Sequence, residues 1–310
     1  MKGLKKIALA TAVAAAPFAA QADLKALDDT TMGNVTGQAG VTIELETKVS
    51  IGQFKYTDEG SFAVNDIVLG GSGVAGGTGT ELLDQLKIDI DVAQDGDAII
   101  HVGSLQTDPA TGAPVPIDWG MTAGSVELIG NDSTGDTTTL ISNLSMYGDL
   151  AALDISVDTA TDHLNAVVAF DIDDMDFDVD FLGIGIRDMT ISGAGTNFDY
   201  DGNGSTAAEE AAAGNTVVEG FDQTTLEGQL ALGKLTNYAN VDLDVYKGSG
   251  LGASSATNVL RVDVNNVYMD VNIADVQIGG DIANGSGLSI GSVALDNLAI
   301  TDTKLAIYGH

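Results

Sequence analysis

The sequence DMDFDVDF at residues 174–181 alternates an aspartate with a large apolar residue. Successive side chains of a β-strand point to opposite faces of the sheet, so this pattern predicts a strand with one apolar and one acidic face. Carboxylates on the same face of a strand lie roughly 7 Å apart and repel one another unless they are solvated or bridged by cations. We expect a solvent-facing row, with a cation-binding ladder as the alternative.

The same alternation of apolar residues recurs through the chain, at Val41–Leu45, Ile88–Val92, Val241–Val245 and Val262–Val264. Many of the 39 glycines, together with Asn and Asp, lie between these runs, and no helix of crossover length separates them. This organisation predicts an all-β fold. Thr80–Gln85 and Ser205–Ala213 are the best helix candidates beyond residue 40.

A short motif, in which Asp or Asn precedes two apolar residues spaced by one, recurs through the chain. It starts at Asp66, Asn143, Asp188, Asp275 and Asn297. The last three separations are near multiples of about 22 residues, which is typical of a β-solenoid or another stacked-β architecture. A β-sandwich remains the alternative, because Asp and Asn commonly precede strands in any acidic β protein.

The N-terminus has the organisation of a secretory signal peptide. Lysines at positions 2, 5 and 6 precede an apolar run over residues 7–20, and Ala20-Gln21-Ala22 is an A-x-A cleavage site. We expect residues 1–22 to be removed, residues 23–40 to form a short helix and linker, and residues 41–310 to form the all-β domain. No apolar stretch after Ala22 is long enough to be a transmembrane span. The chain is therefore predicted to be exported.

Composition excludes several classes of function. The 45 acidic residues against 12 basic ones give a formal charge of −33, which repels nucleic acids. The absence of cysteine excludes disulfides, thiolate catalysis and iron–sulfur clusters. Only Arg187 and Arg261 could clamp a phosphate or carboxylate with a guanidinium.

The residues from Asp199 to Glu210 match the calcium-loop pattern D-x-[DN]-x-[DN]-G-x5-E at every constrained position. Calcium takes six to eight oxygen ligands. The spacing supplies them from the side chains of Asp199, Asp201, Asn203 and Glu210 and from the carbonyl of Ser205. We expect one Ca²⁺ in a loop inserted near residues 197–215 and followed by a helix, with a solvated acidic turn as the alternative reading.

Evidence for an enzyme is weak. Gly287-Leu288-Ser289-Ile290-Gly291 matches a nucleophile elbow, and Asp302 and His310 follow in the order found in α/β-hydrolases. The residues after this motif continue a strand pattern rather than a helix, which argues against an elbow. His101 is expected in a strand, and the glycine-rich residues 70–82 are expected to form a flexible loop. We do not expect catalysis.

The segment LxxLDDxxMxxVTGQAGVTI at residues 24–43 resembles the opening of a poorly characterised family of exported Gram-negative proteins. Some members are labelled pilus-assembly protein, FilA-like. The terminal Tyr308-Gly309-His310 is similar to the family's ending. This resemblance implies a role at the cell surface or beside a filament, and it carries no catalytic residues.

These observations predict an acidic, calcium-stabilised structural protein of the cell surface. It would be a filament or adhesion component that self-associates or binds other surface proteins. Two alternatives remain: a secreted polysaccharide-binding module or hydrolase on a β scaffold, and a periplasmic carrier whose open β-groove holds lipid.

Overall fold

The computed structural model describes residues 40–93, 95–110, 114–131, 135–195, 205–213, 236–280, 282 and 286–309. The chain divides into two units, Met1–Ala39 and Gly40–His310. All described residues belong to the second unit, so the signal peptide expected over residues 1–22 and the helix and linker expected over residues 23–40 lie outside the part described, Gly40 excepted. Within the described residues, no helix is long and apolar enough to cross a membrane.

The described chain is nearly all β, as the alternating pattern predicted. Thirteen strands form one hydrogen-bonded sheet, and all their pairings are antiparallel. The strands are β1 (Val41–Thr47), β2 (Val49–Thr57), β3 (Ser61–Gly70), β4 (Leu83–Val92), β5 (Ala98–Ser104), β6 (Ile117–Ile129), β7 (Thr137–Asp158), β8 (His163–Phe170), β9 (Ile172–Val179), β10 (Ile184–Ser192), β11 (Ala239–Ser249), β12 (Thr257–Ile278) and β13 (Leu288–Ile307). Helical segments are η1 (Ser72–Ala75), η2 (Asp180–Leu182) and α3 (Ala207–Ala213).

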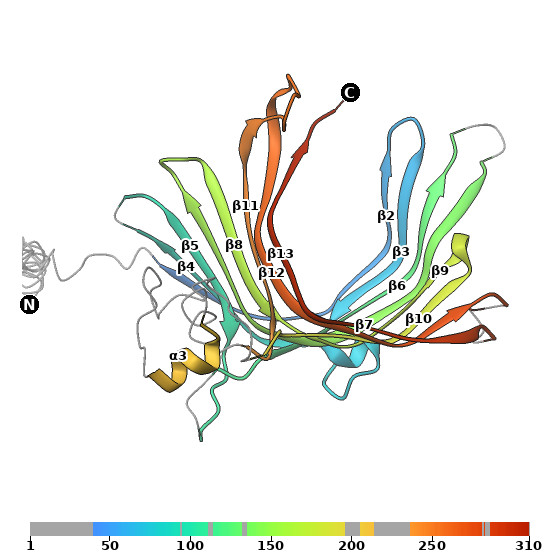
Figure 1. Cartoon of the computed structure of the whole chain (residues 1–310), viewed down its shortest axis with the longest axis horizontal. Coiled ribbons are helices and arrows are strands. Elements are labelled where there is room, and N and C mark those ends of the chain that lie inside the picture. The colour runs from blue at the N-terminus through green and yellow to red at the C-terminus, as the bar shows by residue number, and fades with distance from the viewer. Residues whose placement is uncertain are drawn as a thin grey trace, which may run out of the picture. The chain divides into compact units, whose positions relative to one another are not determined.

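The long strands divide the sheet into two walls (Figure 1). The first wall contains β1, β4, β5, the C-terminal half of β7, β8, β11, the N-terminal half of β12 and the C-terminal half of β13. The second wall contains β2, β3, β6, the N-terminal half of β7, β9, β10, the C-terminal half of β12 and the N-terminal half of β13. Strands β1 and β2 also continue from one wall to the other, because only Lys48 separates them.

Neither expected architecture describes this topology. A solenoid stacks successive coils, whereas here β7, β8, β11, β12, β10 and β9 pair in that order and β9 pairs back to β7, closing a ring of six strands. A sandwich consists of two separate sheets, whereas β7, β12 and β13 each belong to both walls. The solenoid prediction was therefore wrong, although the all-β class was right.

The recurring Asp/Asn motif marks bulges rather than coils. Four of its five starts have a left-handed backbone, with φ of 52° at Asp66, 54° at Asn143, 48° at Asp188 and 56° at Asn297. Asp and Asn tolerate this conformation better than other residues with a Cβ. In β10, Ile184 and Ile186 precede the bulge and Met189 and Ile191 follow it, and all four pair with apolar residues of β12. The bulge shifts the alternation by one residue and keeps the apolar side chains on one face.

Two segments differ from what the sequence indicated. Thr80–Gln85 is not helical: β4 begins within it, at Leu83. The glycine-rich residues 70–82 form a folded turn that contains η1. In this turn Gly73 N–H donates to the carbonyl of Thr80 (3.0 Å), and the backbone N–H and hydroxyl of Ser72 donate to Asp118 Oδ2. A Cβ on Gly71 would overlap the backbone carbonyl oxygens of Thr80 and Leu82, so this position requires glycine.

Candidate functional site

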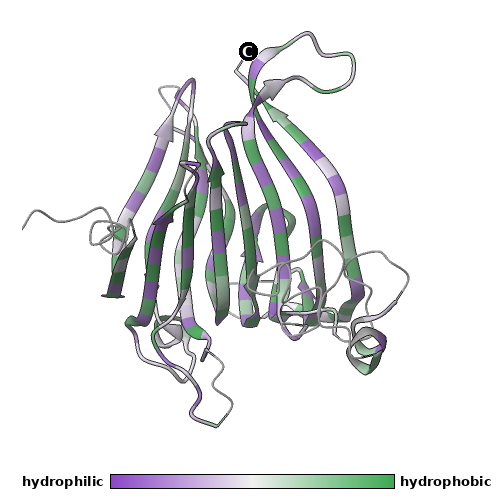
Figure 2. Cartoon of the chain, turned by 90° about the vertical axis from the view of Figure 1, so that its left-hand side faces the viewer, coloured by the Kyte–Doolittle hydropathy of each residue, from purple (hydrophilic) through white to green (hydrophobic). Residues whose placement is uncertain are grey.

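On each wall, the face of the sheet that points toward the other wall carries an apolar row across the full width of the sheet. Directly paired residues of antiparallel strands project on the same face. In the first wall, pairing joins one row across all eight strands: Ile43, Ile88, Val102, Leu153, Val168, Val241, Val267 and Ile300. No polar residue interrupts this row. Figure 2 shows the underlying alternation of polar and apolar residues along the strands of this wall.

The second wall carries an equivalent row that is rich in methionine. Pairing joins Val49, Leu69, Met121, Met146, Met175, Met189, Ile273 and Val293 across its eight strands. We call this set the methionine row. Its four methionines are only partly buried. Methionine is flexible and polarisable and adapts its shape to different apolar partners. This row could therefore contact apolar ligands of different shapes.

Both walls contribute to one apolar cavity of about 260 Å³. Leu69 reaches it from the methionine row, and Val168 reaches it from the row of the first wall. The remaining lining residues, all apolar, are Leu83, Leu86, Ile117, Trp119, Leu150 and Phe170. The apolar faces of the two walls therefore face one another, and we call the space that they line the trough.

Many large apolar side chains of the trough face remain exposed. On β1 and β2, Val41 is 56% exposed and Phe54 is 54% exposed, and on β13 Leu288 is 77% exposed. Soluble monomers rarely leave an apolar surface this extensive unless it binds something. The buried core of the described residues is correspondingly small, and Ile117 and Val259 are its largest fully buried apolar side chains.

The opposite face of the sheet carries the charges. In the first wall, Asp89, His101 and Asp154 are paired across three strands, and His101 Nδ1 lies 2.5 Å from Asp154 Oδ1. The hydrogen bond to Asp154 raises the pKa of His101. His101 lies in β5, the strand position that the sequence predicted. The sheet thus separates an apolar face from an acidic one.

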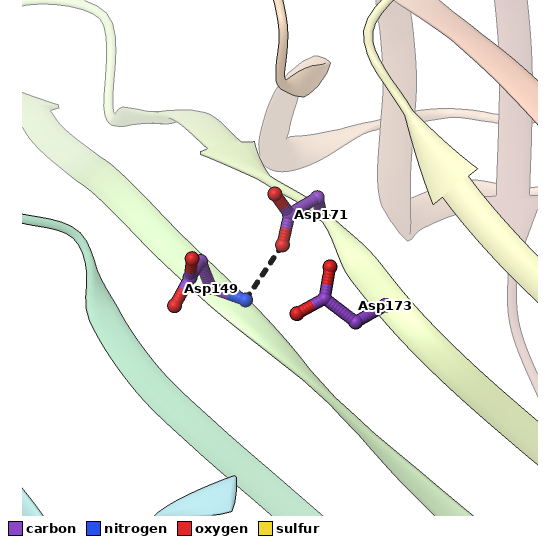
Figure 3. Close-up of side chains that lie close together, drawn as sticks. All are labelled: Asp149, Asp171 and Asp173. Atoms are coloured by element: carbon purple, nitrogen blue, oxygen red, sulfur yellow. Dashed lines mark hydrogen bonds between the residues drawn. The ribbon is translucent and has the colours of Figure 1, made fainter. Parts of the chain in front are cut away.

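Sequence reasoning missed a carboxylate cluster beside the middle of β7, where β8 ends and β9 begins. Figure 3 shows Asp149, Asp171 and Asp173, whose ligand oxygens lie within 4.8 Å of one another. Asp171 Oδ1 accepts a hydrogen bond from the backbone N–H of Asp149 at 2.7 Å. Burial raises the pKa of Asp171 to about 6, and the charges of Asp149 and Asp173 add to this rise. Burial also raises the pKa of nearby Tyr238 to about 12.

The predicted aspartate ladder is not a uniform solvated row. Asp178 is 1% exposed, and Asp180 has a buried carboxylate oxygen, Oδ2, without a hydrogen-bond partner. Asp174 and Asp176 instead form a second cluster with Asp188, whose backbone N–H donates to Asp176 Oδ1 at 2.8 Å. Burial raises the pKa of Asp174. The expectation of four solvent-facing carboxylates was therefore wrong for Asp178.

The predicted calcium ligands lie largely outside the described residues. This applies to Asp199, Asp201, Asn203 and the side chain of Glu210, while Ser205 is described just before α3. The helix predicted after the loop is present. Thr206 Oγ1 accepts from the backbone N–H of Glu209, and Glu209 Oε2 accepts from the backbone N–H of Thr206, which is a capping box. Glu209 therefore caps α3.

The residues of the weak hydrolase match are not assembled into an elbow. Ser289 lies inside β13, opposite Gln277 of β12, and Asp302 lies in the same strand. His310 lies outside the described residues. A nucleophile elbow requires a sharp turn from a strand into a helix, which this strand does not provide.

Comparison with known protein families gave a match to part of the chain. The model of a family of unknown function (DUF6160) matches residues 1–94, which include strands β1 to β4. Comparisons with curated proteins and with solved structures gave no significant match.

Proposed function

We propose that this chain is an exported carrier that holds the acyl chains of an amphiphilic molecule in its trough. The observation that carries the proposal is the pair of uninterrupted apolar rows, one on each wall, that meet at a cavity lined only by apolar residues. Of the alternatives that the sequence left open, this geometry favours the lipid carrier over the polysaccharide module, because sugars need hydrogen bonds to polar side chains, and the residues that line the cavity are all apolar.

The energetics of an acyl ligand fit this surface. Each methylene removed from water contributes about 0.8 kcal/mol, so a bound segment of about eight methylenes contributes about 6 kcal/mol. A protein that releases its ligand needs an adaptable lining rather than a tight one, and the methionine row supports this. The acidic outer face keeps the loaded protein dispersed in water.

Calcium binding is a second part of the proposal, and it rests on the spacing of Asp199, Asp201, Asn203, Ser205 and Glu210. The start of α3 at Ala207 supports it, because a helix begins near the ninth position of such a loop. A Ca²⁺ in the segment between β10 and β11 would stabilise two strands of the six-stranded ring. Its role is structural and separate from the trough.

Trp119 provides a direct test, because it lines the cavity and is the only tryptophan in the sequence. A brominated fatty acid quenches tryptophan fluorescence on contact, so we expect saturable quenching of Trp119 that an unlabelled fatty acid reverses. Leu69→Gln should weaken binding by about tenfold, because covering the exposed part of a leucine side chain with an acyl chain contributes about 1.4 kcal/mol.

Ile99→Gln is the matched control. Ile99 is 46% exposed, against 39% for Leu69, but it pairs with Asp91 and Ser156 on the acidic face. Its substitution should leave the affinity unchanged. Absence of quenching in the wild-type protein, or equal weakening by both substitutions, would contradict acyl binding in the trough.

A further inference from the structure

The two ends of the sheet are long edge strands. Among the described strands, β1 pairs only with β4, β2 pairs only with β3, and β13 pairs only with β12. One end therefore presents β1 and β2, of 7 and 9 residues, and the other presents β13, of 20 residues. Both ends cross from one wall to the other. An edge strand offers a row of backbone N–H and C=O groups to another chain.

The directions of the two edges are compatible with pairing. The first wall contains eight strands from β1 to β13 and the second contains eight from β2 to β13, and every neighbouring pair is antiparallel. With an even number of alternating strands, β13 runs opposite to β1 and β2. A second copy placed along the trough would therefore set its β1 and β2 antiparallel to β13, which continues the alternation in both walls.

The side chains of the two edges are also compatible. Val41, Ile43 and Leu45 of β1 lie on the trough face, and so do Ile300, Leu305 and Ile307 of β13. All six are at least 39% exposed. Pairing the edges would cover these side chains and extend both apolar rows into the next copy. Neither edge contains proline, a residue that proteins use to block such contacts.

Charge indicates one register for this contact. On the acidic face, Glu44 of β1 lies opposite Lys87 of β4, and Lys304 of β13 lies opposite Asp263 of β12. Setting Lys304 of one copy opposite Glu44 of the next produces a row of alternating charges, Asp263, Lys304, Glu44 and Lys87. The same register sets Ile307 opposite Val41 and Leu305 opposite Ile43 on the trough face. Opposite charges directly across a strand pair are stabilising.

We propose that copies of this chain join head to tail, with β13 of one copy pairing with β1 and β2 of the next. The two surfaces differ, so the contact is heterologous and produces an open chain of copies rather than a closed dimer. The troughs of successive copies then form one continuous apolar channel. At a formal charge of −33 the copies repel one another, so salt strengthens the association by screening.

Cysteine cross-linking tests the pairing, because the natural chain contains no cysteine. Full-length Glu44→Cys and Lys304→Cys proteins are oxidised separately and as a mixture, at low salt and at high salt. The mixture should give a cross-linked dimer of one copy of each variant, several-fold more abundant than any product of either variant alone. A chain that carries both substitutions should give a ladder of dimers, trimers and larger species.

Charge reversal provides a second measurement that does not need oxidation. Lys304→Glu and Glu44→Lys should each weaken association roughly threefold to tenfold in sedimentation. A chain with both substitutions again sets opposite charges at positions 304 and 44 of neighbouring copies, so its association should recover. Within one copy, each substitution places a like charge opposite its neighbour, at Lys87 for Glu44→Lys and at Asp263 for Lys304→Glu. The double variant keeps both of these repulsive contacts, so a recovery of association cannot come from improved folding. Cross-linking by each single cysteine variant alone would indicate a two-fold contact. That outcome, or a monomer at all salt concentrations, would overturn the proposal without affecting acyl binding.

Discussion

Arg187 Nη2 lies 2.5 Å from Oδ1 of Asp178, and the carboxylate belongs to a residue that is only 1% exposed. Asn143 Nδ2 donates to the other carboxylate oxygen at 2.9 Å. These contacts join β7, β9 and β10 on the face opposite the methionine row. A buried carboxylate is tolerated when a cation and hydrogen bonds satisfy its oxygens, and here one side chain on each neighbouring strand supplies them.

Removing one partner of this pair should be strongly destabilising. We expect Arg187→Met to lower the free energy of unfolding by about 3–5 kcal/mol, because it leaves the Asp178 charge buried without its cation. Urea denaturation measures this change. The double variant Arg187→Met with Asp178→Leu should recover most of the loss, and Asp173→Asn, at an exposed position, should have little effect. A loss below about 1 kcal/mol for Arg187→Met would contradict a buried pair.

Asp171 should make stability depend on pH. Its pKa is about 6 in the folded protein, against an ordinary value of 3.8, so the folded state binds the proton more tightly than the unfolded state. This contribution to stability is complete below about pH 4 and is lost as the pH rises through about 6. Asp171→Asn removes the charge and keeps an oxygen that can accept from the N–H of Asp149.

We therefore expect Asp171→Asn to raise the melting temperature at pH 7.5 and to change it little at pH 3.5, as measured by thermal denaturation across this range. Asp158→Asn is a useful comparison, because hydrogen bonds from Thr161 and Ala160 lower the pKa of Asp158 and its substitution should destabilise the protein at neutral pH. Equal effects of Asp171→Asn at both pH values would exclude the raised pKa as the cause.

Calcium should raise the melting temperature, because a ligand that binds only the folded state stabilises it by mass action. We expect affinity in the range of about 10⁻⁴ to 10⁻³ M, as in extracellular modules. The double substitution Asp199→Ala and Glu210→Ala should abolish this increase. Glu209→Ala is the control: it removes the capping box of α3 but no predicted ligand, so the response to calcium should remain.

A full calcium response in the double variant would mean that the ion binds elsewhere. The clusters at Asp171 and Asp176 would then be the first positions to substitute. Calcium should also promote association more than sodium chloride of equal ionic strength if it bridges carboxylates of different copies. Equal effects of the two salts would assign association to screening alone.

The strand content was predictable from the sequence, but the arrangement was not. The alternation at residues 174–181 has period two and lies within consecutive residues. It therefore identified β9 without any knowledge of which strands pair. The motif starting at Asp66 and Asn143 was also visible, yet spacing alone cannot distinguish a repeated coil from a repeated bulge. The difference depends on a left-handed backbone at these residues and on which strands pair, and both are properties of the folded sheet.

The candidate site was harder to predict for a related reason. Met121 and Met189 are distant in sequence and become neighbours in one row only through the pairing of β6, β7, β9 and β10. Methionine at strand positions carries no specific signal of its own. The calcium pattern, in contrast, is contained in twelve consecutive residues, so sequence alone could identify it. The Asp149–Asp171 contact forms only because the junction of β8 and β9 lies beside the middle of β7.

The methionine row offers a test of the trough by oxidation. Methionine sulfoxide is polar, and its formation in the row would place polar groups against a bound acyl chain. Because the four methionines are only partly buried, mild peroxide should reach them in the folded protein. We expect oxidation to weaken quenching of Trp119 by a brominated fatty acid, and methionine sulfoxide reductases to restore it.

The matched variant replaces Met121, Met146, Met175 and Met189 with leucine, which keeps the row apolar at similar volume. It should bind the brominated fatty acid about as well as the wild-type protein and become largely resistant to peroxide. Circular dichroism of the oxidised wild-type protein must still show folded strands, so that lost quenching reports ligand binding rather than unfolding. If peroxide weakens binding equally in both proteins, the acyl chain does not contact the methionine row. Binding would then have to be assigned to the residues of the first wall.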